Sequence, residues 1–219
     1  MINELINCDC MDYMATCKDK QFDLAIVDPP YGIDVNMNAG RKAGEVKKFE
    51  EKNWDKGIPD KKYFNELFRV SKNQIIWGGN YFPLPLVQSW VFWDKQVPVG
   101  VSFSDGELAW TSFGGALKKV VIPYSGFRGT EGKIHPTQKP VALYKWLLSH
   151  YAHSGDALLD THSGSGSFRI AAYDMGFDLV SCELDADYCK ANEERFQAHI
   201  AQQELIPVQE IQQLTFGDK

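Results

Sequence analysis

The sequence predicts an α/β protein whose sheet is parallel at least in part. Short apolar runs of strand length alternate along the 219 residues with segments whose apolar residues recur at helical spacing. Such alternation is typical of strand–helix–strand units, in which helices cover the faces of a sheet. Hydrophobic residues make up 44% and charged residues 24% of the chain, close to the globular average, which excludes a disordered chain or a coiled-coil rod.

The elements of the N-terminal part follow from local patterns. Residues 5–8 form a short apolar run that ends at an acid, which predicts a strand, and residues 12–18 predict a short helix. Residues 22–27 are mostly apolar and stop at two prolines, as a buried strand does. Residues 63–70 carry apolar side chains three and four positions apart, which predicts a helix, and residues 74–77 predict a strand that ends at two glycines.

The same patterns continue to the C-terminus. Apolar runs predict five further strands, at residues 90–93, 107–112, 119–122, 157–160 and 179–183. Helical spacing predicts three further helices, at residues 138–150, 167–175 and 187–200. Residues 34–57 contain glycines, lysines and glutamates but almost no apolar side chains, which predicts a mobile loop.

Composition also indicates the compartment. The apolar runs are too short to span a bilayer, and the first residues do not have the pattern of a signal peptide, so we expect no membrane association. Five cysteines without regular spacing indicate reduced thiols rather than a disulfide framework. No second Cys/His pair has the spacing of a zinc site, so we expect no metal. These features favour a cytoplasmic protein.

Asp28-Pro29-Pro30-Tyr31 follows the predicted buried strand at residues 22–27 directly. Ligands of open α/β sheets bind at the carboxyl ends of the strands. The Asp28 carboxylate and the Pro29 carbonyl offer two hydrogen-bond acceptors on a backbone that two prolines hold extended, and Tyr31 offers a ring that can stack on a base. Two acceptors stabilise the positive charge that develops when an aromatic amine acts as a nucleophile.

A glycine-rich turn, residues 160–167, joins a predicted strand to a predicted helix. Glycines at such a junction let a ligand approach the backbone, and Glu183 at the end of the next strand suits the two hydroxyls of a ribose. Arg169 stands where a dinucleotide-binding turn has its third glycine, which disfavours a nicotinamide or flavin site. Taken alone, the glycines also fit a tight turn without a ligand.

A third motif, His135-Pro136-Thr137-Gln138-Lys139-Pro140, opens a predicted helix. A threonine and a lysine at a helix N-terminus can hold a carboxylate, with help from the helix dipole. Taken alone, the motif also fits an ordinary N-capped helix. The Gly78-Gly79-Asn80-Tyr81 turn ends another predicted strand, so Asn80 and Tyr81 are candidates for contacts with a base or a backbone.

Together these motifs resemble the amino-group DNA methyltransferases that use S-adenosylmethionine. The catalytic motif Asp28–Tyr31 precedes the cofactor turn, an order that resembles the beta subclass, a circular permutation of the usual arrangement. The resemblance implies a single Rossmann-like methyltransferase domain over residues 1–219, with a mostly parallel sheet of about seven strands and helices on both faces. It also implies a small target-recognition region at residues 95–134.

The resemblance implies a role for each matching residue. The catalytic residues are Asp28, Pro29, Pro30 and Tyr31, which bind the target amine and base. S-adenosylmethionine is held by Asp9, Cys10, Asp28, His135, Thr137, Lys139, Asp160, His162, Ser163, Gly164, Gly166, Ser167 and Glu183. Within this set, Asp9 receives the adenine of the cofactor, and Thr137 and Lys139 receive its methionine carboxylate. Thr161-His162 departs from the Pro-Phe of many relatives.

The implied reaction is methyl transfer to the 6-amino group of adenine in double-stranded DNA, with the base flipped into the pocket. The 4-amino group of cytosine is the alternative target. A catalytically silent protein with the same fold is the alternative from another functional class. The chain leaves little room for a separate domain that recognises the DNA sequence. A second subunit in a homodimer could contribute to recognition, or the recognised sequence could be short.

The distribution of charge is compatible with a DNA partner despite a net charge of −6 and a pI of about 5.4. Residues 1–33 carry a net −4 and residues 150–219 a net −8, whereas residues 34–149 carry a net +6. We therefore expect DNA to bind through one face, that of the middle segment, in a salt-sensitive manner.

Overall fold

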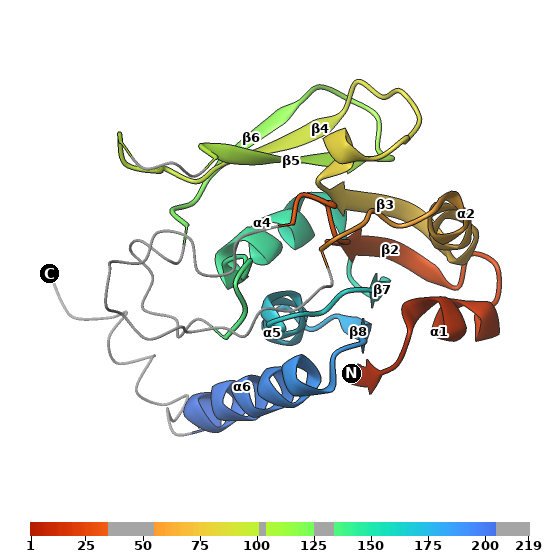
Figure 1. Cartoon of the computed structure of the whole chain (residues 1–219). Helices are drawn as coiled ribbons and strands as arrows, with labels where there is room; N and C mark the ends of the chain where they lie inside the picture. Colours follow the sequence, from red (N-terminus) through yellow and green to blue (C-terminus); the bar gives the residue numbers. More distant parts are fainter. Residues whose placement is uncertain (35–54, 101–103, 125–133, 205–219) are drawn as a thin grey trace, which may run out of the picture.

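The computed structural model describes residues 1–34, 55–100, 104–124 and 134–204. Its centre is an eight-stranded sheet with the strand order β1-β8-β7-β2-β3-β5-β4-β6 (Figure 1). The strands are β1 (Asn3–Asn7), β2 (Phe22–Val27), β3 (Ser71–Trp77), β4 (Trp90–Asp94), β5 (Gly106–Thr111), β6 (Lys118–Val121), β7 (Ala157–Asp160) and β8 (Asp178–Glu183).

The sheet is parallel through its first five strands. Neighbours from β1 to β3 in this order all pair in parallel, β5 runs antiparallel to both β3 and β4, and the edge strand β6 is parallel to β4. A parallel pair needs a crossover connection, whereas an antiparallel pair can be joined by a short loop. The parallel half therefore carries the helical crossovers, and β4 and β5 follow each other along the chain.

Helices cover both faces of the sheet. The helices α1 (Cys10–Thr16) and α2 (Lys61–Val70) contact each other on one face (Figure 1). On the other face, α5 (Ser167–Asp174) contacts both α4 (Val141–Tyr151) and α6 (Ala186–Glu204). A short 3-10 turn, η1 (Gly79–Tyr81), follows β3.

The alternation of side chains along the central strands fills two hydrophobic cores. Leu24 and Ile26 of β2 belong to the core under α4 and α5, whereas Ala25 and Val27 belong to the core under α1 and α2. Successive side chains of a strand point to opposite faces, so a strand buried on both sides is apolar throughout. The apolar pattern of β2, interrupted only by Asp23 near its start, follows from its central place in the sheet.

The predicted α/β architecture is confirmed, with differences at the element ends. The sheet has eight strands where the family resemblance implied about seven, and its edge strand β6, beside β4, matches the strand predicted at residues 119–122. The helix predicted over residues 138–150 begins only at Val141. Pro140 disfavours the helical conformation for the residue before it, so Lys139 stays outside the helix.

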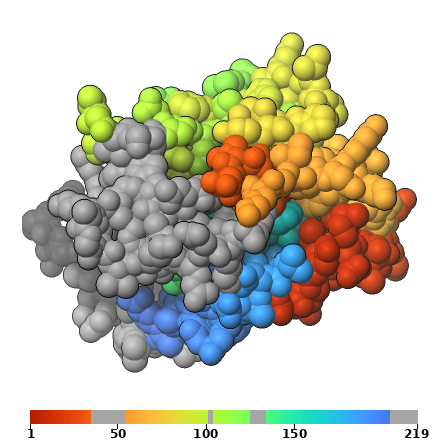
Figure 2. Space-filling view, viewed as in Figure 1, coloured from red at the N-terminus to blue at the C-terminus, as the bar shows by residue number. Residues whose placement is uncertain are grey.

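Three further expectations concern the predicted loop, membrane-spanning helices and the cysteines. Most of the predicted loop at residues 34–57 lies outside the described residues. The described residues 28–34, which follow β2, reach the surface, with β4 and its loops on one side and the C-terminal half of the chain on the other (Figure 2). Within the described residues, no helix is long and apolar enough to cross a membrane. All five cysteines are described, and none is in a disulfide.

Candidate active site

The site lies where β2 and β7 diverge at their carboxyl ends. These two strands pair in parallel only at Leu24 with Leu158 and Ala25 with Leu159. The helix after β2, α2, covers one face of the sheet, and the helix after β7, α5, covers the other. Such a switch point opens a crevice outside the strand ends, and the residues that follow both strands line it.

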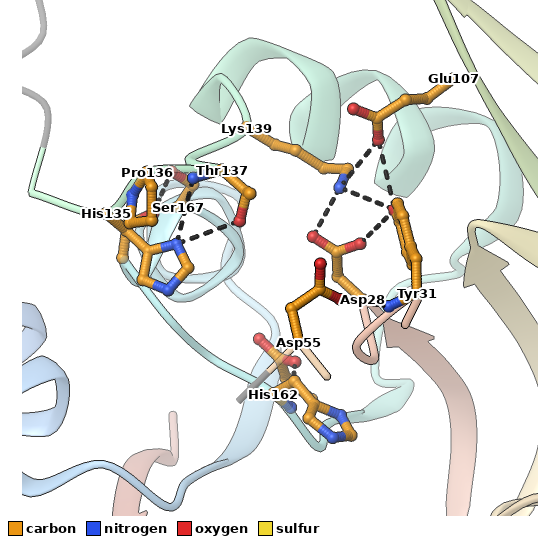
Figure 3. A network of polar contacts seen from close by, with 12 residues as sticks. Asp28, Tyr31, Asp55, Glu107, His135, Pro136, Thr137, Lys139, His162 and Ser167 are labelled. Atoms are coloured by element: carbon orange, nitrogen blue, oxygen red, sulfur yellow. Dashed lines mark hydrogen bonds and ion pairs between the residues drawn. The ribbon is translucent and has the colours of Figure 1, made fainter. Parts of the chain in front are cut away.

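Asp28 follows β2 directly, and both of its carboxylate oxygens have partners. The hydroxyl of Tyr31 donates a hydrogen bond to Oδ1 over 2.6 Å, and the ammonium group of Lys139 lies 2.5 Å from Oδ2 (Figure 3). Lys139 precedes α4 and is 111 positions away in the sequence. The catalytic motif predicted at residues 28–31 and the third motif therefore meet at one carboxylate.

Two residues outside the predicted motifs extend this network. Glu107 of β5 places Oε2 3.0 Å from the Lys139 ammonium and 3.3 Å from the Tyr31 hydroxyl (Figure 3). Its other oxygen, Oε1, lies 2.5 Å from the ammonium of Lys95, which follows β4. Glu107 and Lys95 were not predicted as site residues, because neither stands in a recognisable motif. An acid inside an otherwise apolar strand was the only available signal.

Burial and close charges shift the pKa values of this network. Burial raises the pKa of Asp28, with the Lys139 ammonium acting in the opposite direction. Burial also opposes ionisation of Glu107, but Lys139 and Lys95 outweigh it and lower the Glu107 pKa to about 2. The carboxylates of Asp28 and Glu107 raise the pKa of Lys139 against the effect of burial. Lys139 and Glu107 are therefore charged at neutral pH.

The turn that carries Tyr31 is held from two sides. The backbone N–H groups of Tyr31 and Gly32 donate to Oδ1 of Asp55, a buried residue that sequence analysis did not single out. Gly78 has a φ of +66°, and a Cβ there would lie 2.2 Å from the Tyr31 ring. The ring of Tyr31 stacks on that of Tyr81, with 5.1 Å between centroids, and Tyr81 is 44% exposed.

The glycine-rich turn after β7 is held by α6. Gly164 and Gly166 have φ values of +50° and +73°, which favour glycine. The buried side chain of Asn192 donates to Ser163 Oγ over 2.9 Å and to the Gly164 carbonyl over 3.2 Å. A Cβ on Gly166 would lie 2.3 Å from Asn192 Oδ1. Gly166 thus shapes the turn by leaving room for Asn192.

The residues that begin this turn are buried and polar. Burial raises the pKa of Asp160 to about 8, although its Oδ1 accepts a hydrogen bond from the backbone of His162 over 3.1 Å. Burial lowers the pKa of His162 to about 4, so the imidazole is neutral at pH 7. Thr161 Oγ1 joins the His162 Nδ1 atom, 2.9 Å away, to the Tyr63 hydroxyl of α2, 2.7 Å away.

Acidic side chains stand at the opposite rim. Glu183 ends β8, and its two oxygens accept hydrogen bonds from the backbone N–H groups of Gly164, over 2.7 Å, and Asp185, over 2.9 Å. Asp9 caps the N-terminus of α1 by accepting from the Met11 N–H over 2.8 Å. The strands β1 and β8 are neighbours in the sheet. Their ends therefore bring Asp9 and Cys10, which follow β1, close to Glu183, which ends β8.

His135 and Thr137 face the glycine-rich turn. The ring atoms of His135 would lie 3.8 Å from a Cβ on Gly164, and the ring packs edge-on against Tyr188 with 4.4 Å between centroids. The Thr137 hydroxyl lies 3.1 Å from His135 Nδ1. The two residues form one wall of the crevice, whereas the ammonium of the neighbouring Lys139 points to Asp28 (Figure 3).

These residues enclose a cavity of about 650 Å³, a size typical of small-molecule sites. The predicted residues that line it are Asp9, Cys10, Asp28, Pro30, His135, Thr137, Lys139, His162, Ser163, Gly164, Ser167 and Glu183. The predicted residues Pro29, Tyr31, Asp160 and Gly166 do not line the cavity. Tyr31 and Asp160 contact residues that do, through Asp28 and His162.

Further lining residues were not predicted. They are Cys8, Gln138, Tyr144, Thr161, Ser165, Leu184, Asp185 and Tyr188. Most are sequence neighbours of predicted residues, whereas Tyr144 and Tyr188 come from α4 and α6 as part of helical faces. In the part of the chain that the structure describes, no group of three or more His, Cys, Asp or Glu side chains is placed to hold a metal ion.

Comparison with known proteins finds a matching family model and similar proteins. The sequence model of a family described as DNA methylase matches residues 76–194, more than half of the chain. A protein named "Putative methylase YubD", from Escherichia coli strain K12, is 25% identical over 215 residues, which cover 90% of this chain and 91% of that protein.

Solved structures share the fold at low sequence identity. The complex of M1.HpyAVI with SAM has a TM-score of 0.62 and 18% identity, and the match covers 89% of this chain and all of that chain. The PvuII DNA methyltransferase, which is cytosine-N4-specific, has a TM-score of 0.59 and 13% identity over 88% of this chain and 85% of that chain. These likenesses support the fold.

Proposed function

The chain belongs to the N6/N4 DNA methylase family, and from that premise we propose that it transfers a methyl group from S-adenosylmethionine to the 6-amino group of adenine in double-stranded DNA. The predicted resemblance to amino-group DNA methyltransferases is confirmed at the level of the family. The observation that carries the proposal is the place of Asp28, at the end of a central strand and on the wall of a ligand-sized cavity.

The residues of the cavity fit the proposed cofactor. Glu183 offers a carboxylate to the ribose hydroxyls, and Asp9 offers one to the amino group of its adenine. Gly164 lines the cavity without a side chain, so a ligand can approach the backbone of the turn there. When bound, the cofactor supplies an electrophilic methyl group on its sulfonium. One solved structure of the same fold is a complex with SAM.

The place of Lys139 changes one predicted role. The resemblance implied that both Thr137 and Lys139 receive the methionine carboxylate. Because the Lys139 ammonium lies 2.5 Å from Asp28 and 3.0 Å from Glu107, we assign it instead to Asp28. His135 and Thr137 remain on the cavity wall and are the residues that we assign to the carboxylate end of the cofactor.

Asp28 acts on the target amine mainly by position and charge. Each carboxylate oxygen has about two acceptor sites, so both can accept another hydrogen bond although Tyr31 and Lys139 already occupy one site each. A hydrogen bond from the amine to Asp28, with a second to the Pro29 carbonyl, favours the form in which the nitrogen lone pair is localised. The same contacts stabilise the positive charge that develops on the nitrogen.

DNA contacts follow from the proposed chemistry. A base in a duplex must be flipped out before its amino group can reach Asp28. Tyr31 and the half-exposed Tyr81 form a stacked pair beside Asp28, and we assign this pair to contacts with the flipped base. The beta-subclass order, the recognition region at residues 95–134 and a homodimer stay predictions.

The target base can be tested together with the activity. Purified protein is incubated with S-adenosylmethionine and DNA of mixed sequence, and single-molecule sequencing then detects modified bases. We expect N6-methyladenine at a short recurring sequence. N4-methylcytosine would keep the reaction class and change the base, an alternative that one neighbour of this fold illustrates.

Two controls separate catalysis from binding. The Asp28→Ala variant should lose methylation but keep its affinity for the demethylated cofactor product in calorimetry, because the other cavity residues remain. Asp12→Ala, on the exposed side of α1, is the matched control and should methylate as the wild type does. A wild-type protein that binds neither the cofactor nor its product would favour the silent alternative and contradict the proposal.

A further inference from the structure

We propose that Glu107 is a positioning residue that, held by Lys95, keeps the Lys139 ammonium shared between two carboxylates and so sets the orientation and acceptor strength of Asp28. The inference rests on the proposed function, because it concerns the carboxylate to which the target amine binds. It assigns a role in the reaction to a strand that contributes no sequence motif.

The geometry places one buried cation between two acids. Only 3% of the Lys139 side chain is exposed, and its ammonium contacts Asp28 Oδ2 and Glu107 Oε2 (Figure 3). The same ammonium lies 3.3 Å from the Tyr31 hydroxyl, 5.7 Å from the centre of the Tyr31 ring and 5.3 Å from that of the Trp77 ring. Lys139 therefore depends on these two acids for its ionic partners among the described residues.

The far side of Glu107 is fixed as well. Its Oε1 lies 2.5 Å from the ammonium of Lys95, which is also 5.2 Å from the centre of the Trp93 ring. In the sheet Glu107 pairs with Trp93 of β4, and pairing of the two backbones does not depend on a charged side chain at either position. Burying an acid costs free energy unless partners compensate for the lost hydration. Glu107 has such partners only because two lysines converge on it.

Glu107 affects how strongly the Asp28 carboxylate accepts hydrogen bonds and how readily it holds a proton. A cation 2.5 Å from a carboxylate weakens it as an acceptor toward another donor, and a second acid on the same cation opposes that effect. With glutamine at position 107, the charge of Lys139 would act on Asp28 alone. Asp28 would then hold a proton less readily and would accept a weaker hydrogen bond from the amine, and Lys139 would lose one of its two anchors.

Other titratable groups also face Asp28. They are Tyr31 after β2, Tyr63 of α2, Tyr144 of α4 and Asp160 of β7. Burial raises the pKa of each tyrosine well above its usual value, so these three groups stay neutral over the range of an assay. Asp160 can titrate in that range and responds to Lys139, which makes substitution of Glu107 a cleaner probe than substitution of Lys139.

The test follows single-turnover methyl transfer against pH in wild type and Glu107→Gln. Activity needs ionised Asp28, so it falls on the acid side. We expect Glu107→Gln to move that acid limb to lower pH by about one unit, because removal of a like charge within contact distance of the shared ammonium lowers the Asp28 pKa. We also expect a loss in kcat of about tenfold, with the KM for cofactor unchanged within about twofold.

Two further variants complete the test. Asp94→Asn on β4 removes an equal charge and an ion pair with Lys119 that is more exposed than the pair of Lys95 and Glu107, and it should leave the acid limb in place. Lys95→Gln frees the Glu107 charge to act on Lys139 and should move the acid limb to higher pH. This opposite shift keeps the inference testable if Glu107→Gln does not fold.

The outcomes separate this inference from the proposed function. Opposite shifts of the acid limb in Glu107→Gln and Lys95→Gln support the inference. An acid limb that stays in place in both folded variants overturns it, even if their activity falls, because loss of activity alone also follows from a purely structural role. A wild-type protein that does not methylate any DNA would contradict the proposed function instead.

Discussion

Replacing Gly166 by alanine should destabilise the protein through two separable effects. Gly166 has a φ of +73°, a left-handed conformation that costs a residue with a Cβ about 1–2 kcal/mol. The new Cβ would also lie 2.3 Å from Oδ1 of the buried Asn192, and such overpacking typically costs about 1–3 kcal/mol. Together the two effects predict a loss of about 2–5 kcal/mol in the free energy of unfolding.

Gly176 offers a matched comparison for this prediction. It follows α5 with a φ of +75°, but a Cβ there would meet no atom within 4 Å, so Gly176→Ala should show only the conformational cost of about 1–2 kcal/mol. Urea denaturation monitored by circular dichroism gives the free energies of unfolding of both variants. The comparison requires that the slope of this free energy against urea concentration is the same as in wild type.

The contact with Asn192 can be isolated by a double-mutant cycle. Gly166→Ala should cost less in an Asn192→Ala background than in wild type, because the shorter side chain removes the steric conflict. The difference should be about 1 kcal/mol or more. Equal costs for the Gly166 and Gly176 variants, together with additive effects in the cycle, would refute the steric argument.

Three further predictions concern the cavity. Since burial raises the pKa of Asp160 to about 8, its carboxyl group should stabilise the fold fully below about pH 4 and lose that contribution as pH rises through 8. Asp160→Asn should therefore be more stable than wild type at pH 8.5 but not at pH 4. Equal differences in stability at the two pH values, measured by thermal unfolding, would contradict this. With a pKa of about 4, His162 should stay neutral at pH 5.5 and at pH 7.5. The affinity for the demethylated cofactor product should therefore be equal at these two pH values, both in wild type and in His162→Phe. A pH dependence of affinity in wild type that is absent in His162→Phe would contradict a neutral His162. Glu183→Gln should weaken this affinity by about tenfold or more in calorimetry, because a charged acceptor for ribose hydroxyls is lost. It should also cost about 1–2 kcal/mol of stability, because the amide nitrogen cannot accept one of the two backbone hydrogen bonds from Gly164 and Asp185. Unchanged affinity would place the ribose elsewhere.

Sequence patterns were sufficient to predict the strands and helices because their signals are local. The apolar run of β2, the glycines after β3 and β7, and the helical spacing in α2 each depend on neighbouring residues. The start of α4 was misplaced by three residues because the prediction placed Gln138, Lys139 and Pro140 inside the helix, whereas Pro140 disfavours the helical conformation for the residue before it.

The candidate site was predicted where its residues stand at strand ends. Asp9, Asp28 and Glu183 each follow or end a strand of the parallel half, and the ends of parallel strands meet at one edge of the sheet. The same logic could not reach Tyr144 and Tyr188, because a tyrosine on an apolar helical face has the same pattern whether it fills a core or lines a cavity.

The sequence by itself determined the family, the order of the elements and the strand ends that carry the cavity residues, since all of these depend on residues close together in the chain. Only the tertiary structure decided which charges meet. Lys139 reaches Asp28 across 111 positions, and the antiparallel insertion of β5 between β3 and β4 brings Glu107 to both. Electrostatic interactions depend on distance through space, so the balance of charge on Asp28 is a property of the packed sheet.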